Sequence, residues 1–372
     1  MRQLVVVALL GAAGAAPAQL TFNQWKPLDG VTGVVRKAAS GEASEEPAGG
    51  ADWIPAEPDP AAAAVTNAPV VPRAGGPRAG YQSGQKDRYH PRARDEIRDA
   101  IKRIEKRDAS AYKGLGKAAK LPGEQLAALN RLNAYRYLCG VWAEVTLDPE
   151  HTAFAQAAAE ICEKIGRLDH NPPNPGMKEA DYQKAATGAG RCNLFAGGGP
   201  DSSINGYLND SDPGNIDRVG HRRWCLNPRM GATGFGHAGI YSAMYAMDGG
   251  GSSKPVDIVA YPPPGYMLSR YFSPGYAWSV SLNPGVWHVA DDEKVEVTVC
   301  EASHFGAADP KKKGKPLPLN YRHVDHGGFG MALCIIFRPE DVDTSPGHRY
   351  WVEIKGLAGP RNALEYLVEF VD

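Results

Sequence analysis

The central part of the chain shows apolar positions at helical spacing. Leucines at three-residue steps run through Leu126–Leu132 and lead to Gly140. A second apolar face runs through Phe154–Ile165, with Pro149 near its start and Gly166 directly after it. Proline is favoured in the first turn of a helix and glycine just past its last turn. The pattern therefore predicts two consecutive amphipathic helices.

An additional charged helix is expected upstream, over Asp95–Arg107. Ile97, Ile101 and Ile104 share one face, and acidic residues come first and basic residues last. This order complements the helix dipole at both ends. We expect this helix, within a connector at 86–120, either to pack against the next domain or to stand free.

After a loop-rich stretch that ends near Gly199, short elements follow. Two short helices are expected around Ser203–Asn209 and Val219–Leu226. Apolar runs at Tyr241–Met247 and Val256–Tyr261 are typical of buried strands. Together with the two long helices, these elements predict a mixed helix and sheet domain at 121–262.

The last hundred or so residues change to a two-residue alternation, except for one continuous apolar run at Met331–Phe337. Separated by turn residues, the candidate strands are Ala277–Leu282, Lys294–Val299, Met331–Phe337, Arg349–Ile354 and Leu364–Phe370. Short strands at such intervals favour a β-sandwich, of the immunoglobulin or fibronectin type III kind, at 263–372. The fold class expected for the whole chain is α+β.

The N-terminal region predicts export rather than folded structure. Met1-Arg-Gln is followed by an apolar run from Leu4 to about Ala13 and by Ala16-Pro-Ala18. This pattern is typical of a cleavable signal peptide at 1–18 and is too short for a membrane helix. Residues 19–85 are rich in Ala, Pro and Gly, which predicts a disordered linker. We therefore expect a secreted or extracytoplasmic protein without a transmembrane segment.

Charge and cysteine content narrow the possible partners. The formal net charge of -1 gives no electrostatic reason to expect nucleic acid as a partner. An even number of cysteines in an exported chain favours disulfides. The six cysteines are Cys139, Cys162, Cys192, Cys225, Cys300 and Cys334. Their grouping favours sequential pairing, although the sequence alone leaves other connectivities open.

Polar residues that would converge from separate elements are His170, Asp210 and His221. Two imidazoles and one carboxylate suit a divalent transition metal such as zinc, with water or substrate in the remaining position. The same set suits general acid–base work. Taken singly, each residue is also compatible with a structural role, Asp210 as a helix or turn cap and His221 as a hydrogen-bonding group.

Six segments in a fixed order carry a family resemblance. They are Leu132-Asn-Ala-Tyr-Arg136, Leu147-Asp-Pro149, Leu168-Asp-His170, Cys192-Asn-Leu194, Tyr207-Leu-Asn-Asp210 and Gly220-His-Arg-Arg-Trp224. This succession resembles the bacterial branch of the CAP superfamily, the domain of cysteine-rich secretory, antigen 5 and pathogenesis-related-1 proteins. The resemblance covers about 121–261.

The resemblance implies a three-layer α-β-α sandwich with a cleft that often holds two histidines and two acids. His170, His221 and Asp210 match three of those positions. Cys192 stands where the family has its other acid, a glutamate. Two interpretations of that replacement stay open: a disulfide to Cys225 that staples the loop, or a thiolate that joins a zinc site or acts as a nucleophile.

Three functions follow as hypotheses. The first is an exported binding or cell-surface interaction module for a divalent cation, lipid or wall component, as the resemblance implies. The second is a secreted hydrolase, such as a protease, with His170 or His221 as base and a metal-bound water or Cys192 as nucleophile. The chain lacks the Gly-x-Ser-x-Gly and His-Glu-x-x-His motifs. The third is a structural adhesive module whose cleft is vestigial.

Overall fold

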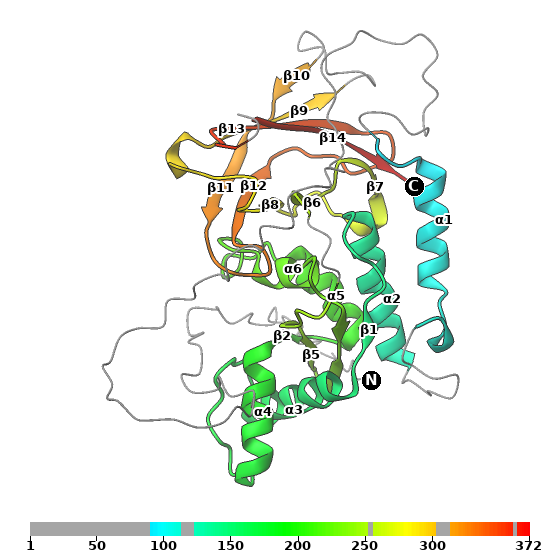
Figure 1. Ribbon diagram of the computed structural model, residues 1–372, viewed down its shortest axis with the longest axis vertical. Coiled ribbons are helices and arrows are strands. Elements are labelled where there is room, and N and C mark those ends of the chain that lie inside the picture. The colour runs from blue at the N-terminus through cyan, green and yellow to red at the C-terminus, as the bar shows by residue number, and fades with distance from the viewer. Residues whose placement is uncertain (1–89, 113–122, 252–255, 303–312, 360–362) are drawn as a thin grey trace, which may run out of the picture.

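The computed structural model describes residues 90–112, 123–251, 256–302, 313–359 and 363–372. The expected signal peptide and linker at 1–85 lie outside these residues. Figure 1 shows a helical part below and a sheet-rich part above, which confirms the α+β class. The helices are α1 (Arg94–Glu105), α2 (Gly123–Leu138), α3 (Pro149–Ile165), α4 (Glu179–Arg191), α5 (Pro200–Asn209) and α6 (Gly220–Cys225). None of these helices has the length and apolar composition needed to cross a membrane.

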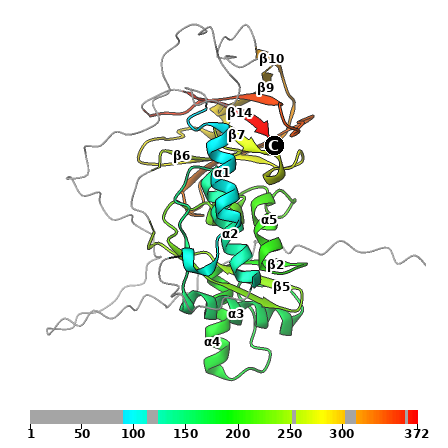
Figure 2. The same ribbon diagram turned by 90° about the vertical axis from the view of Figure 1, so that its right-hand side faces the viewer.

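The predicted amphipathic helices are confirmed. In α3, the Asp148 side chain accepts hydrogen bonds from two backbone N–H groups of the first turn, and Gly166 ends the helix in the left-handed conformation. Helix α1 buries Ile97, Ile101 and Ile104 and packs alongside α2 (Figure 2). The charged helix therefore packs against the next part of the chain rather than standing free.

A small antiparallel sheet lies at the centre of the helical part. Its strand order is β2 (Cys192–Ala196), β5 (Tyr241–Tyr245) and β4 (Phe235–Ala238). One face packs in a cluster with α3 and α4, and α5 contacts the strands from the other side. Close approach of α3 requires Gly236, because a Cβ atom there would lie 2.2 Å from the carbonyl oxygen of Ala155.

The helix α4 falls in the stretch that was expected to be loop-rich. Its sequence contains Gly188 and Gly190, which are typical of loops. A Cβ atom at Gly188 would lie 2.2 Å from the carbonyl oxygen of Phe154 in α3. At Gly188 the glycine thus serves close helix packing rather than a turn, which a linear pattern does not distinguish.

The sheet-rich part contains two larger sheets. One has the order β10 (Lys313–Pro316), β9 (Glu296–Ala302), β13 (Arg349–Lys355), β14 (Ala363–Val371) and β7 (Gly265–Leu268); the other has the order β11 (Leu319–Asp325), β12 (Leu333–Pro339), β8 (Trp278–Leu282) and β6 (Ile258–Tyr261). A two-stranded pair, β1 (Thr146–Leu147) with β3 (Ala232–Thr233), lies in the helical part. Trp278 of one large sheet contacts Tyr350 and Phe370 of the other through edge-to-face ring packing, so the two sheets share an aromatic core.

The expected boundary after residue 262 needs a correction. Strand β6 was predicted as part of the first domain, but it pairs with β8 along Ile258–Tyr261. It therefore belongs to the sheet-rich part. The sequence could not show this, because a buried apolar strand gives no information about which sheet it joins.

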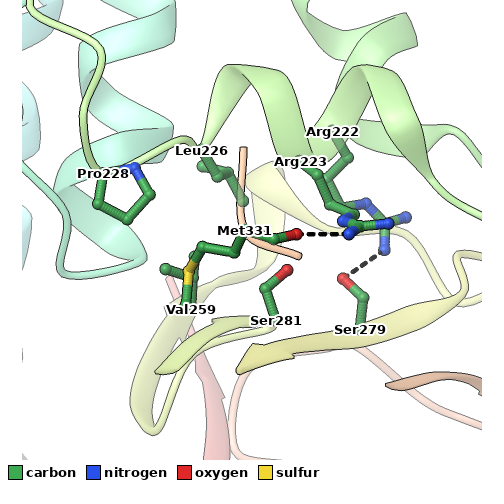
Figure 3. A pocket seen from close by; sticks show the side chains of 8 residues that line it. All are labelled: Arg222, Arg223, Leu226, Pro228, Val259, Ser279, Ser281 and Met331. Carbon is green, nitrogen blue, oxygen red and sulfur yellow. Dashed lines mark hydrogen bonds between the residues drawn. The ribbon is translucent and has the colours of Figure 1, made fainter. Parts of the chain in front are cut away.

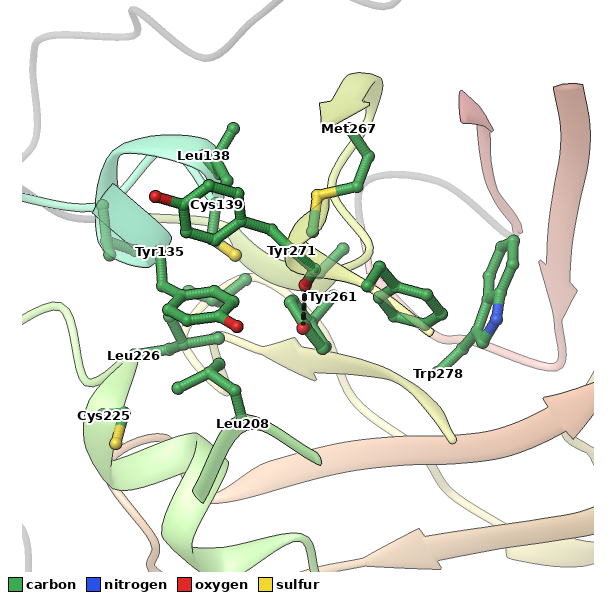
Figure 4. Packing of buried hydrophobic residues seen from close by; sticks show 14 of the residues in the cluster. Tyr135, Leu138, Cys139, Leu208, Cys225, Leu226, Tyr261, Met267, Tyr271 and Trp278 are labelled. Atoms are coloured by element: carbon green, nitrogen blue, oxygen red, sulfur yellow. Dashed lines mark hydrogen bonds between the residues drawn. The ribbon is translucent and has the colours of Figure 1, made fainter. Parts of the chain in front are cut away.

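The two parts share a continuous apolar core. Tyr135 of α2 packs edge-to-face on Tyr271 at a centroid distance of 4.8 Å, and Tyr261 donates a hydrogen bond to the Tyr271 carbonyl oxygen (Figure 4). Leu138 and Leu226 from the helical part belong to the same cluster. The helical and sheet-rich parts are thus joined by buried contacts rather than by a linker alone.

The predicted disulfides are not formed. All six cysteines lie in the described residues as buried thiols without a disulfide. The sequential pairs were wrong for a geometric reason. Cys192 lies in the cluster under α3 and α4, whereas Cys225 lies in the main core. Likewise Cys334 lies in a small cluster with Val219 and Ala277, to which Cys300 of β9 does not belong.

Candidate functional site

The candidate site begins with His221 in the first turn of α6. Its Nδ1–H donates to Asp210 Oδ1 at 2.8 Å. The other oxygen of this carboxylate, Oδ2, accepts the backbone N–H of Arg222 at 3.2 Å. Asp210 ends α5 in the left-handed conformation with φ of 43°, which turns its side chain toward α6. Asp210 therefore orients the imidazole ring and is itself almost fully buried.

His170 follows α3 and is held by α4. Its Nδ1–H donates to the carbonyl oxygen of Ala189 at 2.7 Å. Burial lowers the pKa of His170 to about 4, and the nearby His221 imidazole contributes to this lowering. The structure thus brings the two predicted histidines close enough for their charges to interact. His170 is neutral at neutral pH.

The hydrogen bonds define the same tautomer in both rings. A carbonyl or carboxylate oxygen only accepts, so Nδ1 carries the proton in His170 and in His221. In each neutral ring the lone pair then lies on Nε2. Metal-binding histidines have the same arrangement, in which an oxygen acceptor at one ring nitrogen orients the other nitrogen.

Two further residues build the site and were not predicted to do so. Tyr207 of α5 stacks on the His221 ring at 5.6 Å, and its hydroxyl donates to the carbonyl oxygen of Asn193 at 2.9 Å. Asn193 of β2 donates through Nδ2 to the carbonyl oxygen of His221 at 3.0 Å. Both residues lie in the segments that resemble the CAP family, which was the available signal. Their roles depend on three-dimensional contacts between β2, α5 and α6.

Cys192 takes neither of the roles proposed for it. It is buried among the residues under α3 and α4. Adjacent residues of a strand point to opposite faces, so Asn193 faces α6 and Cys192 does not. Burial holds the pKa of the Cys192 thiol well above its usual range. The residue is therefore neither a staple to Cys225 nor a thiolate ligand or nucleophile.

The three-residue metal set also takes a different form. Both carboxylate oxygens of Asp210 have protein partners, His221 and the Arg222 backbone. Among the residues that the structure describes, no group of three or more His, Cys, Asp or Glu side chains is arranged to hold a metal ion. The arrangement consists of two oriented imidazole rings, and the carboxylate holds Nδ1 of one of them.

The arginines after His221 turn away from the site. Figure 3 shows both side chains extending from α6 toward β8. Arg222 is fully buried and donates to the carbonyl oxygens of Leu208 and Ala277. Arg223 pairs with Asp325, an acid of the sheet-rich part. The two arginines line a small cavity with room for about one water molecule.

Each side of α6 therefore has its own task. Its histidine belongs to a pair of oriented, partly buried rings, and its arginines join the helix to the sheets. Both tasks are defined by contacts within this chain.

In comparisons with known proteins, no family model, no curated protein and no solved structure matches this chain.

Proposed function

We propose that this chain is an exported binding module of the CAP type, and that the His170 and His221 pair is its recognition site. Support comes from the six segments named above, because four of them supply the residues around the pair. His170, Asn193, Asp210 and His221 each come from a different one of these segments. A three-layer α-β-α arrangement is part of this proposal, with helices on either side of the three-stranded sheet.

One observation carries the proposal: both rings have their Nδ1 proton held by an oxygen acceptor. The pair therefore suits a ligand that accepts electron pairs. A divalent transition cation fits this requirement, since neutral imidazole is a ligand for zinc, copper and nickel. With only two nitrogens, the remaining coordination positions would be filled by water or by oxygen atoms of a bound molecule, so we expect weak affinity.

Calorimetric titration with zinc or nickel at neutral pH tests this function. We expect the parent protein to bind one cation per chain and the variant with His170→Ala and His221→Ala to lose that binding. His237→Ala is the matched control, because His237 is a partly exposed histidine paired with Glu124 outside the site. Unchanged binding in the double variant, or no binding in the parent, would contradict a cation-binding pair.

The Asp210–His221 hydrogen bond also favours a second candidate, a hydrolase with His221 as general base. A carboxylate that holds Nδ1–H leaves Nε2 to take a proton from a water or hydroxyl. His221→Gln should then abolish hydrolysis of a test ester or peptide, while His170→Gln affects only binding. The absence of any turnover in the parent would reject this candidate. A cysteine nucleophile is not part of it, since the Cys192 thiol is buried.

A further inference from the structure

Helix α6 is shared between the histidine pair and the sheet-rich part. His221 faces Asp210, whereas Arg222 and Arg223 contact the sheet-rich part. The buried arginine contacts around α6 are called the joint below. Arg223 donates to the Asp325 carboxylate and to the carbonyl oxygens of Gly327 and Met331. These acceptors all belong to the end of β11 and the connection to β12. This segment, residues 325–331, is called the β11–β12 loop below.

The β11–β12 loop also contacts the first turn of α6 directly. A Cβ atom at Gly220 would lie 2.9 Å from the Phe329 ring, so the ring packs against the backbone immediately before His221. The Arg223 guanidinium also lies over the Phe329 ring, with its Cζ atom 5.2 Å from the ring centroid. A larger residue at Gly220 would collide with this ring. The ring and the glycine therefore define together where α6 begins.

The backbone at that point is strained. Val219 has φ of 42°, which places a β-branched residue in the left-handed region that such residues avoid. Its side chain is fully buried in a cluster with Ala277, Cys334 and Ile336 of the sheet-rich part. Strained conformations persist only where their surroundings hold them in place. Here the sheets hold the turn that leads into His221.

We propose that the β11–β12 loop positions His221, with Phe329 and Asp325 as its positioning residues. The loop holds Gly220 and Arg223, the residues on either side of the first turn of α6, and thereby keeps Nδ1 of His221 directed at Asp210. This role rests on the proposed function in one respect, because the proposed function makes the histidine pair a binding site. The sheet-rich part is then a structural component of the site rather than an independent module.

Exchange of the His221 Nδ1 proton with solvent tests this role. The proton is observable by NMR in histidine-labelled protein, and its exchange rate reports opening of the bond to Asp210. We expect Phe329→Ala and Asp325→Asn to speed this exchange roughly tenfold or more, because each loosens the support of α6. Phe329→Leu keeps an apolar contact with Gly220 and should restore most of the protection.

The control on the same loop is His326→Ala. His326 is exposed and pairs with Asp292, away from α6. In this variant we expect the exchange rate of the His221 Nδ1 proton to stay within about twofold of the parent rate. Parent-like exchange in both Phe329→Ala and Asp325→Asn, with the chain folded, would overturn the positioning role. Failure of cation binding leaves this test unaffected, since the measured proton belongs to the protein itself.

Discussion

The joint around α6 and the core between the two large sheets are both buried, yet they are stabilised by different interactions. The sheet core is aromatic and aliphatic, with Trp278 packed against Phe337, Tyr350 and Phe370. The joint instead buries Arg136 and Arg222 completely. Apolar packing depends mainly on volume, whereas hydrogen bonds depend on direction.

Arg136 and Arg222 use main-chain acceptors rather than carboxylates, whereas Arg223 also pairs with the Asp325 carboxylate. Arg136 donates to the carbonyl oxygens of Trp142, Cys225 and Met230, and so ties α2 to the end of α6. Burial lowers the pKa of Arg136 to about 10, so the side chain remains charged at neutral pH. Unlike the sheet core, α6 is therefore held by hydrogen bonds that depend on direction. Substitutions there should be costly even where volume is preserved.

The largest effect is expected for Arg222→Met, which preserves much of the side-chain volume. The substitution removes the arginine donor from the carbonyl oxygens of Leu208 and Ala277, and the Asn209 carbonyl oxygen keeps only the Ser211 hydroxyl. A buried acceptor without a partner costs about 1–3 kcal/mol, so we expect a loss of roughly 3–5 kcal/mol in the free energy of unfolding. Urea denaturation monitored by tryptophan fluorescence measures it.

Arg229→Met is the matched control for that experiment, because Arg229 is exposed and close in sequence. Its effect should stay within about 0.5 kcal/mol. If Arg222→Met cost no more than Arg229→Met, the joint would depend on volume in the same way as the sheet core, and the contrast between the two regions would be lost.

The next effect concerns pH and distinguishes the histidine site from the rest of the molecule. The pKa of His170 is about 4 in the folded chain and 6.5 for an unburied histidine, as in the unfolded chain. The unfolded state therefore binds more protons than the folded state between pH 4 and pH 6.5. The contribution of neutral His170 is fully present above pH 6.5 and is lost as the pH falls toward 4. Between pH 7 and pH 5 we expect about 2 kcal/mol less stability from this residue alone.

Urea denaturation of the parent and of His170→Gln at both pH values isolates that contribution. The variant should lose less stability on acidification, because it has no imidazole to protonate. His237→Gln should keep the slope of the parent, since His237 is partly exposed and outside the site. Equal slopes in the parent and His170→Gln would mean that His170 is not buried as neutral imidazole.

Much of the fold was predictable because its signals are local. The apolar stripe and its flanking Pro149 and Gly166 located α3, and alternation located β13 and β14 close to their observed limits. The helix α4 was missed because Gly188, which looks like a loop residue, serves packing against α3. Local patterns predict an element, and they do not say which partner requires a small residue.

The site was predictable only as a set of residue types. Asp210 and His221 do meet, but Asp210 holds Nδ1 of His221 instead of standing beside it as a further ligand. That role depends on the left-handed conformation of Asp210, which a sequence pattern does not indicate. The cysteines show the same limit, because strand alternation places Cys192 on the opposite face from Asn193 and the α6 residues that Asn193 contacts. Direction, rather than proximity along the chain, decided both outcomes.

The smallest effect is expected for Ile335→Val, at the centre of the sheet core. Ile335 of β12 is fully buried and belongs to the main apolar cluster. Removal of one methylene from such a position costs about 0.5–1.5 kcal/mol, because neighbouring side chains take up part of the space. The same urea denaturation measures this loss, and NMR exchange of the His221 Nδ1 proton in this variant should match the parent. A loss of stability as large as that of Arg222→Met would show that the sheet core tolerates substitution no better than the joint. Faster exchange of the His221 Nδ1 proton would show that packing of the sheet core, rather than the β11–β12 loop, determines the orientation of His221.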